Sequence, residues 1–240
     1  MMQQALKEWR KLKTDDFSKV DSTIKRDPRY NISFPKGGLI LRQTVRDLPR
    51  EKQPGYDTWR HNFDHVWLTA AEAGSFVPES PTAGQSFSIP NGLATRLAKF
   101  HFVDQVKGEA DAWATKEVQS ASLSGQVVKV HDNIVTIHLS GKARCVASPN
   151  GAVNPYSGNR ISKERGVALT ISGRLSYDRS ARTFRTFDIL AHGSRWGTAT
   201  YNARERDMGP APIGFAFELI ETKPQNMTRP KFLLWKYFEK

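Results

Sequence analysis

Two histidines four residues apart, His61 and His65, have a spacing found among metal ligands. Neutral imidazoles at this spacing share one face of a helix or of a strand, and Asp64 lies between them. A catalytic zinc ion needs a third protein ligand and an open position, and only the fold could supply one of the other histidines. A metal-dependent hydrolase is therefore one hypothesis. The alternative is that both histidines pack beside Trp59 and Trp67.

Enzyme motifs of high specificity are absent from the sequence. There is no G-x-S-x-G elbow around a serine, no G-x-G-x-x-G or G-x-x-x-x-G-K segment to hold a phosphate, and no H-E-x-x-H. Cys145 is the single cysteine and ends an apolar stretch, which is typical of a small buried side chain rather than a reactive thiol. We predict no catalytic residue and no cofactor, and we expect a protein that is not an enzyme.

The tryptophans and a few polar residues form a second candidate site. Large aromatics on the concave side of a curled sheet, with a small number of polar groups, would make a pocket for an apolar ligand. The residues predicted to line it are Trp59, Trp67, His101, Asp104, Trp113, Arg195 and Trp196. In the alternative interpretation these tryptophans fill the core, as large aromatics usually do.

A basic segment forms a third candidate site. The chain has 36 Lys and Arg against 24 Asp and Glu, a formal net charge of +12, and residues 142–185 alone hold nine basic and two acidic residues. Such a concentration favours polyanions if the side chains share one face. The candidate residues are Arg160, Lys163, Arg165, Arg174, Arg179, Arg182 and Arg185. If they scatter, they are ordinary solvated surface.

The elements that must position these residues are predicted to be mainly strands. Residues 120–145 predict a hairpin with a turn at Asp132-Asn133, since both residues tolerate positive φ. Alternation then assigns one set of side chains to the core face: Val128, Val130, Val135, Ile137 and Leu139. Residues 167–177 and 183–191 repeat the pattern, and Gly173 is expected to mark a bend or bulge.

One helix stands out in this β pattern, over residues 91–100. Leu93, Leu97 and Phe100 recur at helical spacing, and Asn91 is expected to cap the first turn. We therefore predict a mainly β fold with minor α, in which a curled antiparallel sheet or β-barrel-like domain is closed by one helix. The predicted parts are a helical N-terminal arm (1–38), a single β-domain (39–222) and an aromatic, basic C-terminal tail (223–240).

The composition places the chain among soluble globular proteins. It is 38% hydrophobic and 10% aromatic, and no run is long and apolar enough to span a membrane. The N-terminus lacks the apolar core of a signal peptide, so export would require a longer gene, and the compartment stays open. The oligomeric state is also open.

Several short segments resemble a family of uncharacterised bacterial proteins, many of them exported. The segments are Val45–Pro49, Lys99–Asp104 with Gly108, Leu175–Phe187, Ser194–Gly197 and Gly209–Phe215. They extend over most of the chain. The resemblance implies no known activity and assigns no catalytic residue.

Together these patterns favour a non-enzymatic binding domain for an apolar or amphipathic small molecule, or for a partner segment, on the concave side of the sheet. The alternative is a basic module that binds nucleic acid or another polyanion through residues 142–185.

Overall fold

A computed structural model describes residues 3–4, 32–51, 61–149, 164–223, 226–233 and 236–238. The chain divides into two compact units, residues 1–33 and 34–240, and every element discussed below belongs to the second. Most of the predicted N-terminal arm therefore lies outside the described residues, so that prediction stays untested.

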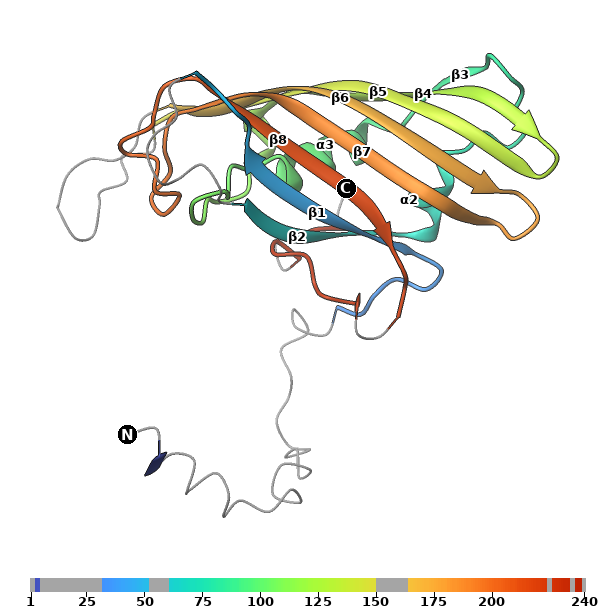
Figure 1. Cartoon of the computed structure of the whole chain (residues 1–240), viewed down its shortest axis with the longest axis horizontal. Coiled ribbons are helices and arrows are strands. Elements are labelled where there is room, and N and C mark those ends of the chain that lie inside the picture. The colour runs from blue at the N-terminus through green and yellow to red at the C-terminus, as the bar shows by residue number, and fades with distance from the viewer. Residues whose placement is uncertain are drawn as a thin grey trace. The chain divides into compact units, whose positions relative to one another are not determined.

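The second unit is built on one antiparallel sheet of eight strands (Figure 1). The strands are β1 (Leu39–Asp47), β2 (His61–Leu68), β3 (Ser86–Ser88), β4 (Val118–His131), β5 (Ile134–Ala147), β6 (Arg165–Asp178), β7 (Thr183–Trp196) and β8 (Ala211–Ile220). Their order is β2-β1-β8-β7-β6-β5-β4-β3, so β2 and β3 form the two edges. The prediction of a mainly β, antiparallel fold is confirmed. The sheet curls but does not close into a barrel.

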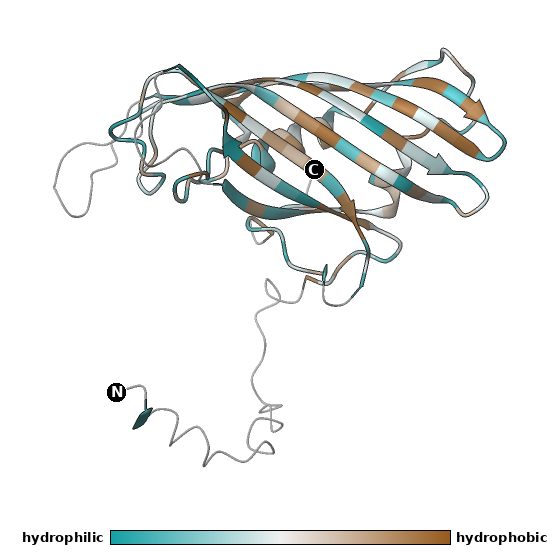
Figure 2. Ribbon diagram, in the orientation of Figure 1, coloured by the Kyte–Doolittle hydropathy of each residue, from teal (hydrophilic) through white to brown (hydrophobic). Residues whose placement is uncertain are grey.

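Alternation of side chains gives the sheet one dry face and one wet face. Figure 2 shows hydrophobic and hydrophilic residues following one another along the long strands. In β5, Val135, Ile137 and Leu139 are buried, whereas His138 between them is exposed. Apolar burial on one face is what specifies the register of such a sheet.

The central hairpin forms as predicted, with one error in its first strand. His131 pairs with Ile134 across Asp132-Asn133, and Asp132 has the positive φ (51°) expected of this turn. However, the register shifts between Val127 and Lys129. This β-bulge turns Val128 outward, where it is 44% exposed, and makes Val127 the buried residue.

Glycines permit the bending of the long strands. A Cβ on Gly141 would lie 2.2 Å from the Ser122 carbonyl oxygen, and a Cβ on Gly193 would lie 2.0 Å from that of Ala168. Only glycine allows neighbouring backbones to approach so closely. At Gly173 the pairing continues without interruption, and the irregularity in this hairpin lies instead between Ser176 and Tyr177.

Helix α3 (Asn91–His101) packs in the concavity of the sheet (Figure 1). Its buried face contains Leu93, Leu97 and Phe100, as the spacing predicts. The helix begins one residue earlier than expected, because Pro90 occupies the N-cap and Asn91 the first helical position. Phe102, just beyond the helix, meets the rings of Phe215 and Phe217 on β8.

Two short helical segments and the C-terminal segment complete the unit. Helix α2 (Ala70–Gly74) follows β2 and begins with a capping box between Thr69 and Glu72, and a single 3-10 turn (Thr115–Glu117) precedes β4. Phe232, Leu233 and Tyr237 of the C-terminal segment are buried. In the part of the chain that the structure describes, no helix is long and apolar enough to cross a membrane.

Candidate functional site

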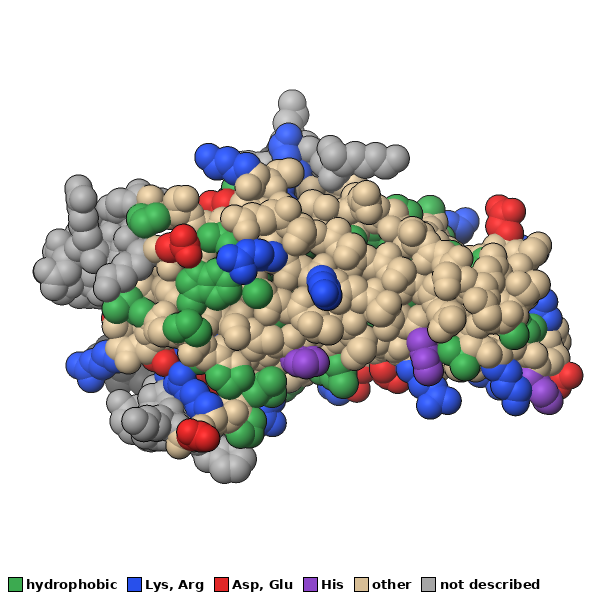
Figure 3. Space-filling model, turned by 90° about the horizontal axis from the view of Figure 1, so that it is seen from above, with side chains coloured by type: hydrophobic (Ala, Val, Ile, Leu, Met, Phe, Trp, Pro, Cys, Tyr) green, Lys and Arg blue, Asp and Glu red, His purple; other side chains and the backbone are tan. Residues whose placement is uncertain are grey.

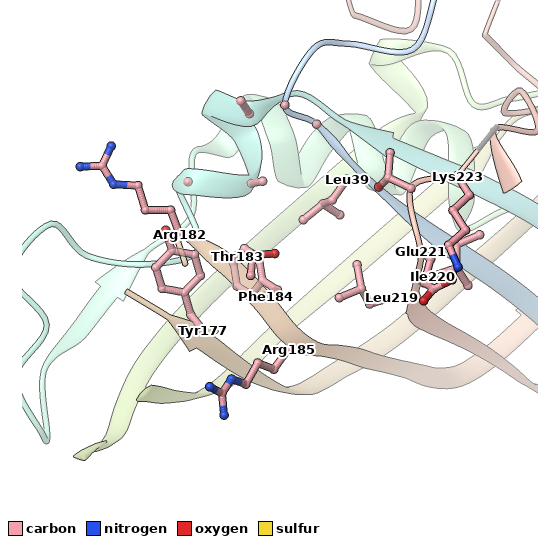
Figure 4. Close-up of a pocket in the computed structure, with 16 residues that line it drawn as sticks. Leu39, Tyr177, Arg182, Thr183, Phe184, Arg185, Leu219, Ile220, Glu221 and Lys223 are labelled. Atoms are coloured by element: carbon pink, nitrogen blue, oxygen red, sulfur yellow. Dashed lines mark ion pairs between the residues drawn. The ribbon is translucent and has the colours of Figure 1, made fainter. Parts of the chain in front are cut away.

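A pocket of about 670 Å³ opens where β1 begins and β8 ends, and we call it the end pocket. Helix α2 borders one side, and the turn between β6 and β7 borders another (Figure 4). It is lined by Gly37, Gly38, Leu39, Ala70, Ala73, Gly74, Tyr177, Arg182, Thr183, Phe184, Arg185, Leu219, Ile220, Glu221, Thr222 and Lys223. Four separate segments of the chain therefore meet around it.

Small residues on one side of the end pocket leave its space open. Gly37, Ala70 and Gly74 have little or no side chain, and a Cβ on Gly74 would meet no atom within 4 Å. Across from them, Leu39 and Leu219 point into the space in Figure 4. An apolar surface facing small residues is suited to the body of a flat or chain-like apolar ligand.

Basic side chains stand at the mouth of the end pocket. Arg185 pairs with Asp178 at 2.7 Å, and Lys223 pairs with Glu221. Arg182 extends outward from the rim beside Tyr177 (Figure 4). The lining therefore combines charged side chains and the hydroxyls of Thr183 and Thr222 with the apolar Leu39 and Leu219.

Asp178 holds the turn that carries these arginines. Its carboxylate accepts hydrogen bonds from the Ser180 hydroxyl (2.6 Å), the Ala181 amide (3.2 Å) and the Arg185 guanidinium (2.7 Å). These bonds stabilise the ionised form and lower the pKa of Asp178, with the Ser180 bond contributing most. The carboxylate thus stays charged and fixes the turn at the mouth.

The tryptophans that were predicted to line a cavity lie elsewhere in the fold. Trp67 and Trp113 are buried, and their indole N–H groups donate to the carbonyl oxygens of Thr228 (3.0 Å) and Phe102 (2.9 Å). Trp196 is half-buried and donates to Glu164 at 3.0 Å. Trp59 lies outside the described residues. Of the predicted ligand-binding residues that the structure describes, none lines the end pocket.

Two of the predicted polar residues, Asp104 and Arg195, do come together, in a buried ionic cluster around Arg204. The Arg204 guanidinium binds Asp104 through two hydrogen bonds of 2.8 Å and Asp47 through bonds of 2.7 and 2.8 Å. Arg195 lies 3.9 Å from Asp104 and binds the Asp207 carboxylate. Arg195 and Arg204 are both fully buried. This arrangement fixes the loop before β8 against the end of β1.

The charged groups of the ionic cluster shift one another's pKa values. Burial alone would lower the pKa of Arg204, but its hydrogen bonds to Asp47 and Asp104 outweigh burial and raise it. Burial and the nearby Arg204 lower the pKa of Arg195. Arg50 and Arg195 hold the pKa of Asp207 below its usual value despite burial. The cluster is therefore a set of fixed ion pairs, which gives it a structural role.

His101 belongs to a second buried network, which anchors the C-terminal segment. The Gln43 amide nitrogen donates to the His101 carbonyl (2.7 Å), so the Gln43 oxygen accepts from Nδ1 of the imidazole (3.0 Å). Nε2 then accepts from the Tyr237 hydroxyl at 2.7 Å, and that hydroxyl accepts from the Trp67 amide at 3.2 Å. Asp64 lies 3.5 Å from Nδ1. Gln43 and Tyr237 thus satisfy both ring nitrogens of a neutral imidazole, whereas the buried Oδ2 of Asp64 has no hydrogen-bond partner in the described part of the chain.

Arg96 closes this network from helix α3. Its guanidinium lies 4.4 Å from the centre of the Tyr237 ring and pairs with Glu72 at 2.9 Å. It also donates to the Trp67 carbonyl oxygen at 3.3 Å. The buried ring of Tyr237 is thus held by a cation–π contact as well as by hydrogen bonds.

The free energy of unfolding is expected to fall with acidification because of His101. Burial lowers the pKa of His101 more than Asp64 raises it. Below a pH of about 6.5 the unfolded chain takes up a proton that folded His101 does not, so stability falls by up to about 1.4 kcal/mol per pH unit. Denaturant unfolding at pH 7.5 and at pH 5.5 measures this slope. A His101→Gln variant with the same slope would contradict it.

The remaining histidines and the cysteine are not gathered into a site. His61 is exposed and stacks edge-on against Phe63 at 4.9 Å, and His65 is half-buried on the same strand. No group of three or more His, Cys, Asp or Glu side chains within the described ranges could hold a metal ion. Burial raises the pKa of the Cys145 thiol to about 12, which makes it a poor nucleophile.

The described candidate residues of the basic segment lie mainly at the two ends of β6. Arg165 begins the strand, where it stacks 4.1 Å from the Trp113 ring centre, whereas Arg179, Arg182 and Arg185 surround the turn beyond Asp178. An extended strand of this length separates the two groups by about 40 Å. Arg174 is exposed on β6 opposite Asp188, and Arg160 and Lys163 lie outside the described residues. Figure 3 shows one face, on which Lys and Arg appear as separate groups.

The sequence did not reveal most of the residues that meet in the end pocket, in the ionic cluster and in the network around His101. Arg204, Asp207 and Tyr237 carried no motif, and Asp47 and Asp104 are 57 residues apart in the chain. No protein-family model, curated protein or solved structure matches the chain.

Proposed function

We propose that this chain is a non-enzymatic binding protein for an apolar or amphipathic small molecule, which it takes in the end pocket. The observation that carries the proposal is an open space of about 670 Å³ that is lined by apolar side chains, among them Leu39 and Leu219, together with polar and charged ones. Ligand sites generally have volumes of about 300–1,000 Å³ and combine apolar walls with a few polar groups.

The end pocket is favoured over the concave face because side chains already fill the concavity. Helix α3 packs there, and the cavity between Leu41, Phe76, Phe102 and Phe187 has a volume of about 10 Å³. Such a volume holds about one water molecule. A small molecule of ten or more heavy atoms is therefore expected at the end of the sheet, not inside the curl.

Polar groups at the mouth of the end pocket would orient the ligand. Thr183, Thr222 and Tyr177 offer hydroxyl groups, and the floor at Leu39 and Leu219 offers apolar contact. An amphipathic molecule satisfies both surfaces, since its polar end stays in water while its apolar body is buried.

Filling the end pocket is expected to weaken binding of decanol at least tenfold. Gly74→Phe introduces a ring at a lining position where a Cβ meets no neighbouring atom, so the fold should tolerate it. Gly92→Phe is the matched control, because Gly92 is also helical, exposed and unobstructed but lies outside the pocket. Titration calorimetry gives the affinities, and amide NMR shifts locate the ligand.

Decanol binding that both the Gly74→Phe and the Gly92→Phe variants retain at the unmodified protein's affinity would contradict the proposal. Amide shifts confined to the exposed outer face of the sheet would contradict it as well. Binding that is lost in both variants would show a general effect of the added ring, and melting curves of the two proteins would identify it.

A further inference from the structure

We infer that the ligand of the end pocket carries a negative charge, a carboxylate or a phosphate monoester, and that Arg182 selects it. This inference rests on the proposed function. Three basic residues line the pocket, and two of them are already compensated, Arg185 by Asp178 and Lys223 by Glu221. Among the described residues, Arg182 has no ion-pair partner. The mouth therefore holds one uncompensated positive charge.

The backbone of Arg182 supplies an independent observation. Its φ is 53°, in the left-handed region that glycine adopts most easily and that larger side chains seldom adopt. The residue is exposed in the turn after β6, so no core contact requires a large side chain there. A charged side chain held in a conformation that favours glycine suggests a role for the charge itself.

The chemistry of the guanidinium names the class of ligand. Arg presents N–H groups in a planar fork that matches the oxygens of a carboxylate or a phosphate. In Figure 4 the side chain starts at the rim, next to Tyr177 and Thr183, and extends outward, away from Leu39 and Leu219. A ligand with an apolar body on this floor would present its anionic end to Arg182 at the mouth.

The test compares three ligands of equal chain length below their aggregation concentrations: decanoate, decanol and decyltrimethylammonium. Decanoate is expected to bind about tenfold more tightly than decanol, and the cationic amphiphile more weakly than either. Added salt should reduce the advantage of decanoate, because the pair at the mouth is exposed to solvent. Decyl phosphate is expected to behave like decanoate, whereas inorganic phosphate alone should not bind measurably.

Arg182→Gly removes the charge and is expected to leave the fold intact. The variant is expected to bind decanoate no better than decanol, and its thermal midpoint should rise by about 1–4 °C because glycine relieves the turn. Arg182→Lys should retain part of the preference for decanoate. Arg179→Ala is the control, since it removes one positive charge from the same turn at a residue that does not line the pocket.

Each result decides between the two ideas. Equal affinities for decanoate and decanol in the unmodified protein would overturn the charge inference and leave the proposed function intact. Absence of binding for all of the ten-carbon ligands would overturn the proposed function itself. Inorganic phosphate that binds as tightly as decyl phosphate would also overturn the inference, because the apolar body would then contribute nothing.

Discussion

Arg204→Ala is expected to lower the free energy of unfolding by about 3–5 kcal/mol. Arg204 is fully buried, and its guanidinium makes paired hydrogen bonds with Asp47 and Asp104. Without it, both carboxylates remain in the interior with most of their charge uncompensated. Denaturant unfolding followed by circular dichroism measures the loss.

The control for this prediction is Arg174→Ala. Arg174 is exposed on β6 opposite Asp188, and removal of an exposed charge usually changes stability by less than about 0.5 kcal/mol. A triple variant, Arg204→Met with Asp47→Asn and Asp104→Asn, should recover part of the loss, because it removes the stranded charges. An Arg204→Ala variant as stable as the unmodified protein would show that water reaches the ionic cluster.

Tyr237→Ala is expected to cost about 3–5 kcal/mol and to detach the C-terminal segment from the sheet. The ring is buried beside Phe100 and against the Arg96 guanidinium, and its hydroxyl joins His101 to the Trp67 amide. Loss of the side chain would leave an apolar cavity and two unsatisfied polar groups. Faster hydrogen exchange at the Trp67 amide measures the detachment directly.

Two further substitutions separate the contributions of Tyr237. Tyr237→Phe keeps the ring and removes the hydroxyl, so it should cost about 1–3 kcal/mol for the unpaired His101 nitrogen. Tyr201→Ala is the control, because Tyr201 is 63% exposed and should lose little stability. If Tyr237→Ala destabilised the protein without faster exchange at Trp67, the anchoring role would be wrong.

Local patterns in the sequence were sufficient for the strands and the main helix. Alternation in residues 134–139 predicts the buried face of β5, and Leu93, Leu97 and Phe100 predict the buried face of α3. These features depend on residues close together in the chain, where the period of two or of 3.6 residues acts directly. The bulge near Val128 escaped prediction, because a register shift depends on the partner strand as much as on the strand itself.

The candidate site could not be predicted in the same way. The sequence placed the ligand among the tryptophans, whereas Trp67 and Trp113 pack as core residues with their indole nitrogens satisfied. The lining of the end pocket comes from the starts of β1 and β7, helix α2 and the end of β8. No spacing along the chain relates these segments, since their proximity results from the order of strands in the sheet.

By itself, the sequence determined which side chains avoid water and therefore that the chain forms antiparallel strands around one helix. Only the tertiary structure decided which charges are compensated and which space stays open. The physical reason is range: burial patterns act between neighbours in the chain, whereas the pairing of Arg204 with Asp47 and Asp104 requires contacts across 100 residues or more. Within the described ranges Arg182 likewise has no ion-pair partner, because Asp178 pairs with Arg185 and Glu221 pairs with Lys223.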